Sequence, residues 1–143
     1  MSTVSETGVD AVAEVVDRFN AAWNDHDLAA AIALTSEDCV FEATSPAPDG
    51  QRCAGHAALR AAWQPIFDDV TSQFTVEDSF TAGPRVVQRW RYDWAGGHVR
   101  GVDVITVSGG QVTEKLAYVK GYAPRSRIGR PSRKARMAST ASV

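Results

Sequence analysis

Residues 99–122, VRGVDVITVSGGQVTEKLAYVKGY, decide the fold of this chain. Apolar residues alternate on both sides of the Ser-Gly-Gly stretch at 108–110, which predicts two β-strands joined by a tight turn. The first strand carries one acidic side chain, Asp103, among four valines and an isoleucine. A carboxylate in apolar surroundings is costly when ionised, so Asp103 is expected to pair with a cation or to stay protonated.

The rest of the second half also has the pattern of strands connected by short turns. Gly83-Pro84 and Ala95-Gly96-Gly97 provide two more turns, so the last four strands are expected to form an antiparallel meander. One short strand is expected earlier in the chain. The predicted strands are 38–43, 71–81, 85–94, 99–107 and 111–122.

Helices are expected only in the first half. Apolar side chains recur three and four positions apart in residues 9–23, 28–34 and 55–67, as on the buried face of an amphipathic helix. Asp27 stands where it can cap the second of these helices. Residues 44–52, with two prolines and a glycine, are expected to be a loop. Helices followed by a meander indicate the α+β class rather than a parallel α/β sheet.

Length and composition limit the class of protein. The 143 residues suit a single domain, and the 44% of hydrophobic residues allow a substantial core. No apolar run reaches the roughly 18 residues of a membrane-spanning helix, and the first residues lack the basic and apolar segments of a signal peptide. Cys39 and Cys53 fit no metal or disulfide pattern, so we expect reduced thiols and a cytoplasmic location.

Charge is distributed unevenly along the chain. Residues 123–143 hold six basic and no acidic side chains, whereas residues 1–122 hold nine basic and 17 acidic ones. We therefore expect a flexible N-terminus at 1–8, one folded domain at 9–122 and a disordered basic tail at 123–143. The charge of the tail can attract nucleic acid or an anionic surface. Because the body of the chain is acidic, nucleic acid is not expected to be its main partner.

Side chains alternate between the two faces of a strand, so the turns decide which residues share a face. Counted from the turn at Gly96-Gly97, Asp103 lies opposite Trp90; counted from the turn at 108–110, it lies opposite Lys115. The helices are expected to cover this apolar face and to leave a pocket, with Asp103 and Lys115 as its polar groups. The expected inner residues are Gln88, Trp90, Tyr92, Gly101, Asp103, Ile105, Lys115, Ala117 and Val119, and the outer ones are Arg89, Arg91, Asp93, Val102, Val104, Leu116 and Tyr118.

Three stretches resemble the nuclear-transport-factor-2-like superfamily, in particular its SnoaL-like and ketosteroid-isomerase-like branches. They are VVDRFNAAWNDHDLAAAIALTSEDCVFEA at 15–43, CAGHAALRAAW at 53–63 and RGVDVITVSGGQVTEKLAYVKG at 100–121. The resemblance implies a cystatin-like roll: a cone-shaped, strongly curved antiparallel or mixed sheet wrapped around three helices, with a deep cavity inside. It also implies a twofold homodimer through the outer face of the sheet, whose valines and leucine are too apolar for free surface.

The resemblance assigns roles to single positions. In ketosteroid isomerases the strand acid that matches Asp103 donates a hydrogen bond to the substrate oxyanion. The matching tyrosine position is Phe19 and the matching general-base position is Ala43, and neither side chain can do that chemistry. For the SnoaL-like cyclases the acid position matches Ala117, and Lys115 stands at a site often held by histidine. The resemblance therefore implies the fold and the cavity and leaves the reaction open.

The candidate catalytic residues are Asp103, Lys115 and His56. Asp103 is interpreted either as an acid or base, or as half of a structural ion pair with Lys115. His56 begins the third expected helix, near the expected opening of the pocket. No metal and no cofactor are expected. The expected ligand-binding residues are Phe19, Trp23, Phe41, Ala43, Trp63, Phe67, Trp90, Tyr92, Ile105, Ala117 and Val119.

Three functions stay open. The first is a cofactor-independent enzyme for isomerisation, cyclisation or water addition on an apolar, carbonyl-bearing or polycyclic molecule. The second is a non-catalytic ligand-binding or dimerisation module with the same cavity. The third is an adaptor that binds protein or nucleic acid through the basic tail. The expected partners are an apolar small molecule and a second copy of the chain, and no membrane partner is expected.

Overall fold

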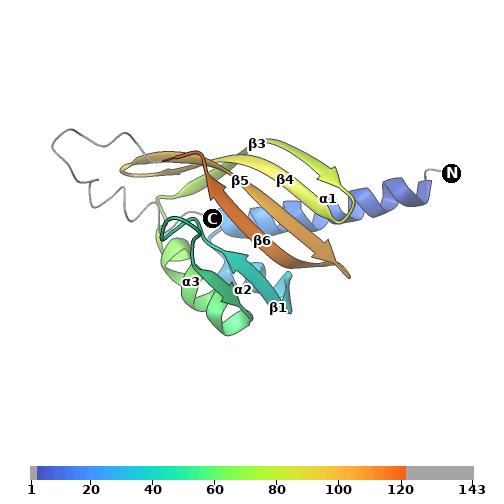
Figure 1. Cartoon of the computed structure of the whole chain (residues 1–143), viewed down its shortest axis with the longest axis horizontal. Coiled ribbons are helices and arrows are strands. Elements are labelled where there is room, and N and C mark those ends of the chain that lie inside the picture. Colours follow the sequence, from blue (N-terminus) through green and yellow to red (C-terminus); the bar gives the residue numbers. More distant parts are fainter. Residues whose placement is uncertain (1–2, 122–143) are drawn as a thin grey trace.

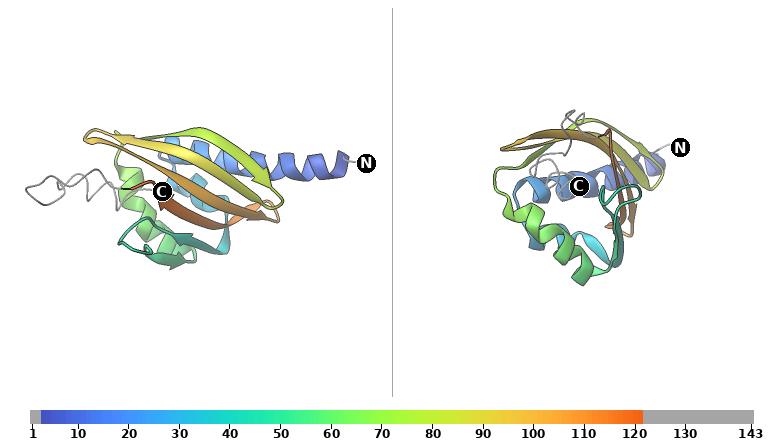
Figure 2. Two further views of the ribbon diagram at one scale, coloured as in Figure 1. Left: turned by 45° about the horizontal axis from the view of Figure 1, so that its top comes forward. Right: turned by 60° about the vertical axis from the view of Figure 1, so that its left-hand side comes forward.

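Six strands form one curved sheet in the computed structural model of this chain, and three helices lie along its inner side (Figures 1 and 2). The structure describes residues 3–121. Residues 1–2 and 122–143, which include the basic tail expected at 123–143, lie outside the described residues. The α+β class and the cone-shaped roll expected from the sequence are confirmed.

The elements, in chain order, are α1 (Thr3–Asn24), α2 (Leu28–Ala33), β1 (Thr35–Glu42), β2 (Arg52–Ala54), α3 (His56–Asp68), β3 (Gln73–Ala82), β4 (Arg85–Trp94), β5 (Gly97–Ser108) and β6 (Gln111–Val119). The sheet order is β2-β1-β6-β5-β4-β3. Neighbouring strands are antiparallel except for β1 and β6, which are parallel. Helix α1 contacts β3 to β6, whereas α3 packs on β1 and β2 (Figure 2). In this strand order, β5 and β6 lie in the middle of the sheet.

Some element boundaries differ from those expected. Helix α1 begins at Thr3, six residues earlier than expected, and β6 ends at Val119, three residues earlier. The segment expected to be a loop ends in β2, a three-residue strand that pairs with β1 and is too short to show an alternating pattern. The expected helix cap is confirmed, because the Asp27 side chain accepts a hydrogen bond of 3.0 Å from the N–H of Ala30.

Two strand registers differ from those expected, although the faces do not. The turn between β4 and β5 is centred one residue earlier than expected, so Asp103 lies opposite Gln88 instead of Trp90. A turn centred between Gly109 and Gly110, together with an irregularity in the β5–β6 ladder, leaves Asp103 opposite Ala117 instead of Lys115. Each change moves the partner by two residues. Because side chains alternate with a period of two, every residue keeps its expected face.

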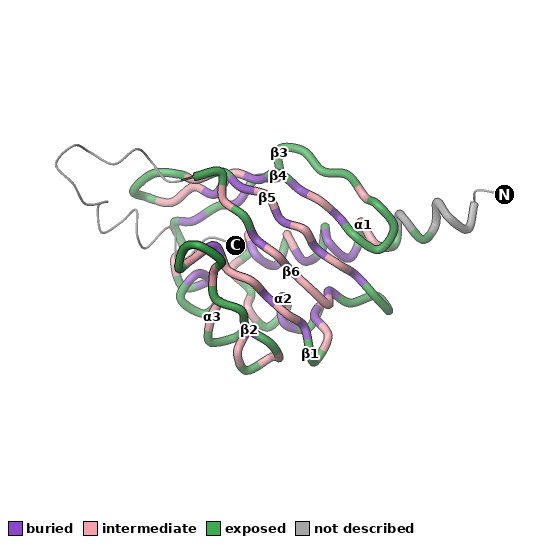
Figure 3. The backbone as a smooth tube through the Cα atoms, viewed as in Figure 1, coloured by how far each residue is buried: buried purple, intermediate pink, exposed green. Residues whose placement is uncertain are grey.

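Burial alternates along the central strands as those faces require (Figure 3). Aromatic side chains from the helices and the sheet fill the space between them. The ring centres of Trp23 and Trp63 are 5.1 Å apart, and those of Phe41 and Trp63 are 5.5 Å apart, both in edge-to-face geometry. Within the described residues, these rings occupy the deep cavity that the resemblance implies.

Gly101 allows β5 to pass close to its neighbours, which gives a first test. A Cβ at this position would overlap the carbonyl oxygen of Tyr118 and lie 2.5 Å from the indole ring of Trp90. Gly101→Ala is therefore expected to lower the free energy of unfolding, measured with urea, by about 1–3 kcal/mol. Gly8→Ala is the control, because its methyl group meets nothing within 4 Å. Unchanged stability of Gly101→Ala would contradict the close strand packing.

Candidate functional site

A buried ion pair lies between the two central strands. The ammonium of Lys115 on β6 is 3.0 Å from Oδ2 of Asp103 on β5, and the two side chains are 2% and 0% exposed. Lysine and aspartate side chains are almost never fully buried unless they are paired. The expected pairing of these two residues is confirmed, and the pair forms the polar centre of the inner face.

A helix and a neighbouring strand hold the carboxylate from the other side. Gln88 of β4, directly opposite Asp103, donates a hydrogen bond of 3.1 Å from Nε2 to Oδ2. The Gln88 amide is held in turn by Asn20 of α1: Nδ2 of Asn20 donates to Oε1 at 2.8 Å, and Nε2 of Gln88 donates to Asn20 Oδ1 at 3.2 Å. A chain of four polar side chains therefore runs from α1 across three strands to Lys115.

The candidate residues chosen from the sequence omit Asn20 and Gln88. Gln88 shares the inner face of β4 with Trp90, and Asn20 follows Val16 by four residues, on the apolar stripe of its helix. A polar side chain on a buried face requires a hydrogen-bond partner. The two residues could therefore have been identified from the sequence, because each amide interrupts an otherwise apolar run of inward-facing positions on its helix or strand.

Aromatic rings and burial set the electrostatics of the pair. Lys115 Nζ lies 5.3 Å from the ring centre of Trp23 and 5.8 Å from that of Phe41, within cation–π range. Burial raises the pKa of Asp103 above its ordinary 3.8, against the opposing effect of Lys115 and of the Gln88 hydrogen bond. Burial lowers the pKa of Lys115 below its ordinary 10.5, against the effect of Asp103. The two pKa values therefore move toward each other, which makes proton transfer within the pair less costly than in water.

Hydrogen-bonding capacity is left over at this centre. Oδ1 of Asp103 makes no hydrogen bond of good geometry among the described residues, although the nearby Trp90 indole favours the ionised carboxyl group and lowers its pKa. Apart from Asp103, the Lys115 ammonium meets no hydrogen-bond acceptor among them either. A buried polar atom without a partner raises the free energy of the fold unless something binds to it. The pair can therefore offer a proton donor and a proton acceptor to a molecule that reaches it.

A cleft of about 500 Å³ opens where β1 and β6 separate. Pairing between these strands stops where β1 ends, and the chain continues into the loop 43–51 while β6 runs on. Three of the expected ligand-binding residues, Ala43, Ala117 and Val119, line this cleft. Ala117 lies directly opposite Asp103 in the β5–β6 ladder, so the inner wall of the cleft borders the polar centre.

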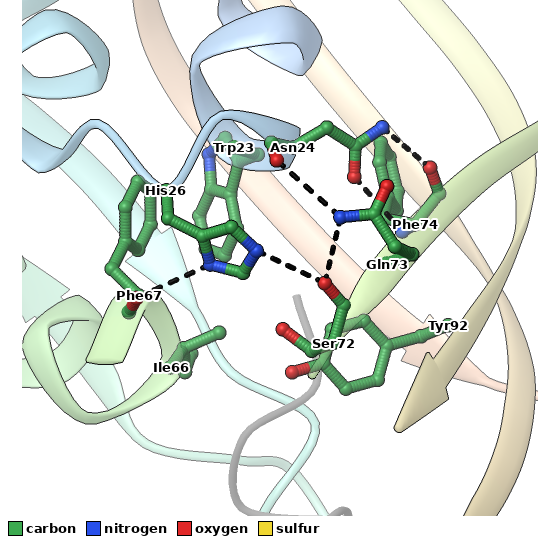
Figure 4. Close-up of a pocket in the computed structure, with 9 residues that line it drawn as sticks. All are labelled: Trp23, Asn24, His26, Ile66, Phe67, Ser72, Gln73, Phe74 and Tyr92. Atoms are coloured by element: carbon green, nitrogen blue, oxygen red, sulfur yellow. Dashed lines mark hydrogen bonds between the residues drawn. The ribbon is translucent and has the colours of Figure 1, made fainter. Parts of the chain in front are cut away.

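A second pocket, of about 10 Å³, lies between α1, α3 and the start of β3 (Figure 4). His26 lies across it, with Nδ1 3.2 Å from the carbonyl oxygen of Phe67 and Nε2 3.0 Å from that of Ser72. A carbonyl oxygen only accepts, so His26 donates from one ring nitrogen or the other according to its tautomer, between the end of α3 and the segment before β3. Trp23, Phe67 and Tyr92 also line this pocket, which has room for no more than one water molecule.

The remaining expected ligand-binding residues lie in the packed core. Phe19, Phe41, Trp63, Trp90 and Ile105 are each at most 1% exposed. Their side chains pack against one another and against α1 and α3, as the close ring pairs require. Their role as ligand contacts stays a prediction, whereas their role in the core is observed.

His56 lies away from the ion pair. Its Nε2 is 3.0 Å from the hydroxyl of Thr35 and 3.3 Å from the Thr35 carbonyl oxygen. The Thr35 hydroxyl donates to the carbonyl of Ile32 at 2.6 Å, so it accepts from His56. His56 therefore ties the start of α3 to the start of β1. The expected position near the pocket opening is wrong, because β1 runs parallel to β6 and its start lies at the end of β6 remote from Ala117.

Other reactive groups offer little to this site. Between residues 3 and 121, no three His, Cys, Asp or Glu side chains are grouped so that they could hold a metal ion. Burial raises the pKa of the Cys39 thiol to about 12 and also raises that of Cys53, so neither is a thiolate at neutral pH. No helix in the same part of the chain is long and apolar enough to cross a bilayer.

The ion pair predicts strong coupling between two substitutions. Lys115→Met leaves a buried carboxylate without its cation and is expected to lower the free energy of unfolding by about 3–5 kcal/mol. Adding Asp103→Asn removes that unpaired charge, so the double variant is expected to recover most of the loss. Urea denaturation of the four chains gives the coupling free energy, and simple additivity of the two single effects would contradict the pairing.

The pKa shifts also predict how stability depends on pH. The pKa of Asp103 is raised from 3.8, so its stabilising contribution is present below that pH and lost as the pH rises through its folded pKa. The pKa of Lys115 is lowered from 10.5, so its contribution is present above that pH and lost as the pH falls through its folded pKa. Relative to the Asp103→Asn/Lys115→Met variant, the wild-type chain is therefore expected to be least stable near neutral pH. A difference in unfolding free energy that does not change with pH would exclude burial as the dominant cause.

Comparisons of sequence and structure identify the family to which this chain belongs. The family model of the SnoaL-like domain matches residues 16–115. An NTF2-like protein of unknown function from Mesorhizobium loti is 43% identical, over 79% of this chain and 93% of that chain, with a TM-score of 0.73. Two further structures have a similar fold. A candidate ketosteroid isomerase from Kribbella flavida is 17% identical over 87% of this chain and 93% of that chain, with a TM-score of 0.67. A candidate polyketide cyclase from Xanthomonas campestris is 22% identical over 78% of this chain and 91% of that chain, with a TM-score of 0.62. No curated protein sequence matches the chain. This chain belongs to the SnoaL-like domain family.

Proposed function

We propose that this chain binds an apolar small molecule with a carbonyl group and acts on it by acid–base chemistry at the Asp103–Lys115 pair. The reaction class is isomerisation, cyclisation or water addition. Each of these reactions moves protons at a carbonyl oxygen or at a neighbouring carbon, and a positioned acid–base pair is what such transfers require.

The observation that carries the proposal is a buried carboxyl group with one oxygen left without a partner, beside a cleft. Oδ2 of Asp103 is engaged by Lys115 and Gln88, whereas Oδ1 makes no hydrogen bond of good geometry, and the Trp90 indole acts on the carboxyl group only to lower its pKa. Strand β5 lies between β4 and β6, so Gln88 approaches the carboxyl group from one side and Ala117 lies on the other. A molecule in the cleft would approach from the side of Ala117, whose methyl group shares the cleft wall with Val119 and with polar side chains such as Glu42 and Arg52.

The electrostatics of the pair support proton transfer in both directions. With the proton on Asp103, the carboxylic acid can donate to a carbonyl oxygen. With the proton on Lys115, the carboxylate can take a proton from a carbon next to the carbonyl group. Because burial moves the two pKa values toward each other, the free energy that separates the two forms is smaller than for the same groups in water.

Replacing the carboxyl group by an amide tests the enzymatic proposal. Asp103→Asn is expected to reduce turnover at least about 100-fold, because an amide neither gives nor takes the proton. The assay uses β,γ-unsaturated cyclic ketones and follows the absorbance of the conjugated product. Asp93→Asn is the matched control, since Asp93 pairs with Arg91 on the outer side of the sheet. Turnover by Asp103→Asn at the wild-type rate would exclude the assigned role.

The alternative is a non-catalytic ligand-binding module of the same fold. It is favoured by Phe19, Ala43 and Ala117, which lack a hydroxyl or carboxyl group at the positions that the resemblance makes catalytic. Under this alternative, native mass spectrometry would detect a bound ketone that stays unchanged after long incubation. Product formation in the same sample would exclude it.

We also propose that the outer face of the sheet pairs with a second copy of the chain. Phe80 is 60% exposed and Tyr118 is 55% exposed on this face. Exposed apolar side chains that adjoin one another are typical of an interface. Four apolar residues pair in one row across neighbouring strands of this face: Phe80 on β3, Val87 on β4, Val104 on β5 and Leu116 on β6.

A charge in this row tests the dimer. Val104→Glu is expected to shift the chain to a monomer, because an interface cannot bury a carboxylate without a partner. Ser108→Glu, at the exposed end of β5, is expected to leave the mass unchanged. Sedimentation equilibrium measures both, and a wild-type chain that is monomeric at all concentrations would rule out the proposed pairing.

A further inference from the structure

Lys115 is an unusual choice for an ion pair that serves only to hold the fold together. Arginine is the residue that suits static, buried pairs, because its guanidinium stays charged and binds carboxylates with two parallel hydrogen bonds. Lysine can lose its proton when buried and then becomes an amine with a free electron pair. The Lys115 ammonium has a proton acceptor 3.0 Å away, in Asp103, and no other hydrogen-bond acceptor among the described residues.

The surroundings of Lys115 connect it to the cleft. Lys115 and Ala117 are two residues apart on the inner face of β6, so their Cα atoms are separated by about 7 Å along the strand. On the parallel neighbour β1, Phe41 lies opposite Lys115 and Ala43 follows two residues later. The small side chains of Ala43 and Ala117 line the cleft, while Phe41 covers Lys115. Lys115 does not itself line the cleft. It lies one inward-facing position from Ala117 and beneath Phe41, so formation of an imine requires the carbonyl group or the lysine side chain to pass the small side chains of Ala43 and Ala117.

We infer that Lys115 is a nucleophile that forms an imine with an aldehyde or ketone held in the cleft, and that Asp103 moves the protons. The inference rests on the proposed binding of a carbonyl compound and adds a covalent step to it. It distinguishes Lys115 from a residue that only tunes the acidity of Asp103.

The step balances without any further reactant. Asp103 takes a proton from the ammonium, and the free amine forms a C–N bond to the carbonyl carbon as the C=O π electrons move to oxygen. Asp103 protonates that oxygen and then accepts a proton from the nitrogen, which gives a neutral carbinolamine. Protonation of its hydroxyl by Asp103 lets water leave as the nitrogen electron pair forms the C=N bond. The products are a protonated imine and one water molecule.

The site suits the product as well as the reactant. The protonated imine carries the same single positive charge as the ammonium, and it remains beside the Asp103 carboxylate. The rings of Trp23 and Phe41, which face Lys115 Nζ at 5.3 and 5.8 Å, can stabilise either cation. The exchange of ammonium for imine therefore adds no unpaired charge to the interior.

Reductive trapping tests the inference on the full-length chain. The chain has three lysines, Lys115, Lys120 and Lys134, so a modified site is identified without ambiguity by peptide mapping. The probe is 2-naphthaldehyde with sodium cyanoborohydride, which reduces the imine to a stable naphthylmethyl amine. Because burial lowers the pKa of Lys115 and the neutral amine is the reactive form, the naphthylmethyl group is expected on Lys115 in preference to the exposed Lys120. Labelling of Lys120, Lys134 or the N-terminal amine without Lys115 would overturn the inference.

Two variants and a binding measurement make the outcome specific. Lys115→Arg keeps the positive charge but cannot form the imine, so labelling is expected to fall to the background of the other amines. Lys120→Arg, at an exposed position, is the control and should keep the label on Lys115. The wild-type peptide map stands by itself if Lys115→Arg does not fold. Saturable quenching of tryptophan fluorescence by 2-naphthaldehyde reports binding separately. Saturable binding without an adduct on Lys115 overturns the imine and leaves the proposed binding intact, whereas absence of both overturns both.

Discussion

The contact between the Lys115 ammonium and the Asp103 carboxylate is the constraint on which the rest of this structure depends. Either charge alone would be strongly unfavourable inside the cone, where both side chains are almost completely buried. Together they link β5 to β6 in the middle of the sheet, and Gln88 and Asn20 extend the network to β4 and α1. The polar network therefore restricts which helix face and which strand register can form the core.

The same constraint explains how a largely filled interior can still offer a site. Aromatic rings pack between the sheet and the helices, and Trp23 and Phe41 cover the ammonium. Beyond the last β1–β6 pair a cleft of about 500 Å³ opens, lined by Ala43, Ala117 and Val119 together with polar side chains that include Glu42, Asp49 and Arg52. Along β6, the part near Lys115 is packed against aromatic rings, whereas the part from Ala117 onward borders the cleft. The polar centre is close to the cleft without being exposed to bulk solvent, which is the condition under which acid–base chemistry of a buried pair is effective.

The sequence was sufficient to predict the class, the main elements and the faces of the central strands, because these follow from local periodicity. Asp103 and Lys115 share a face whatever the exact register, since a shift of two residues preserves alternation. Exact partners were not predictable, because one residue of difference in a turn centre moves the opposing residue from Trp90 to Gln88. The position of His56 was misjudged for a related reason: only the parallel β1–β6 pairing reveals which end of the sheet the start of α3 occupies. The filling of the cone depends on how several aromatic side chains pack together, which no spacing rule describes.

A nuclear magnetic resonance titration of the Lys115 side chain tests the buried pair most directly. With the chain labelled at lysine nitrogen and carbon, the Nζ and Cε signals of Lys115 report the protonation of its amine in the folded state and in urea. Burial lowers the pKa of Lys115, so the account predicts that the folded chain releases this proton at a lower pH than the unfolded chain. It also predicts that Asp103→Asn moves the folded titration further down, because the carboxylate that favours the ammonium is gone. A Lys115 signal that titrates as in urea, and does not respond to Asp103→Asn, would contradict the account.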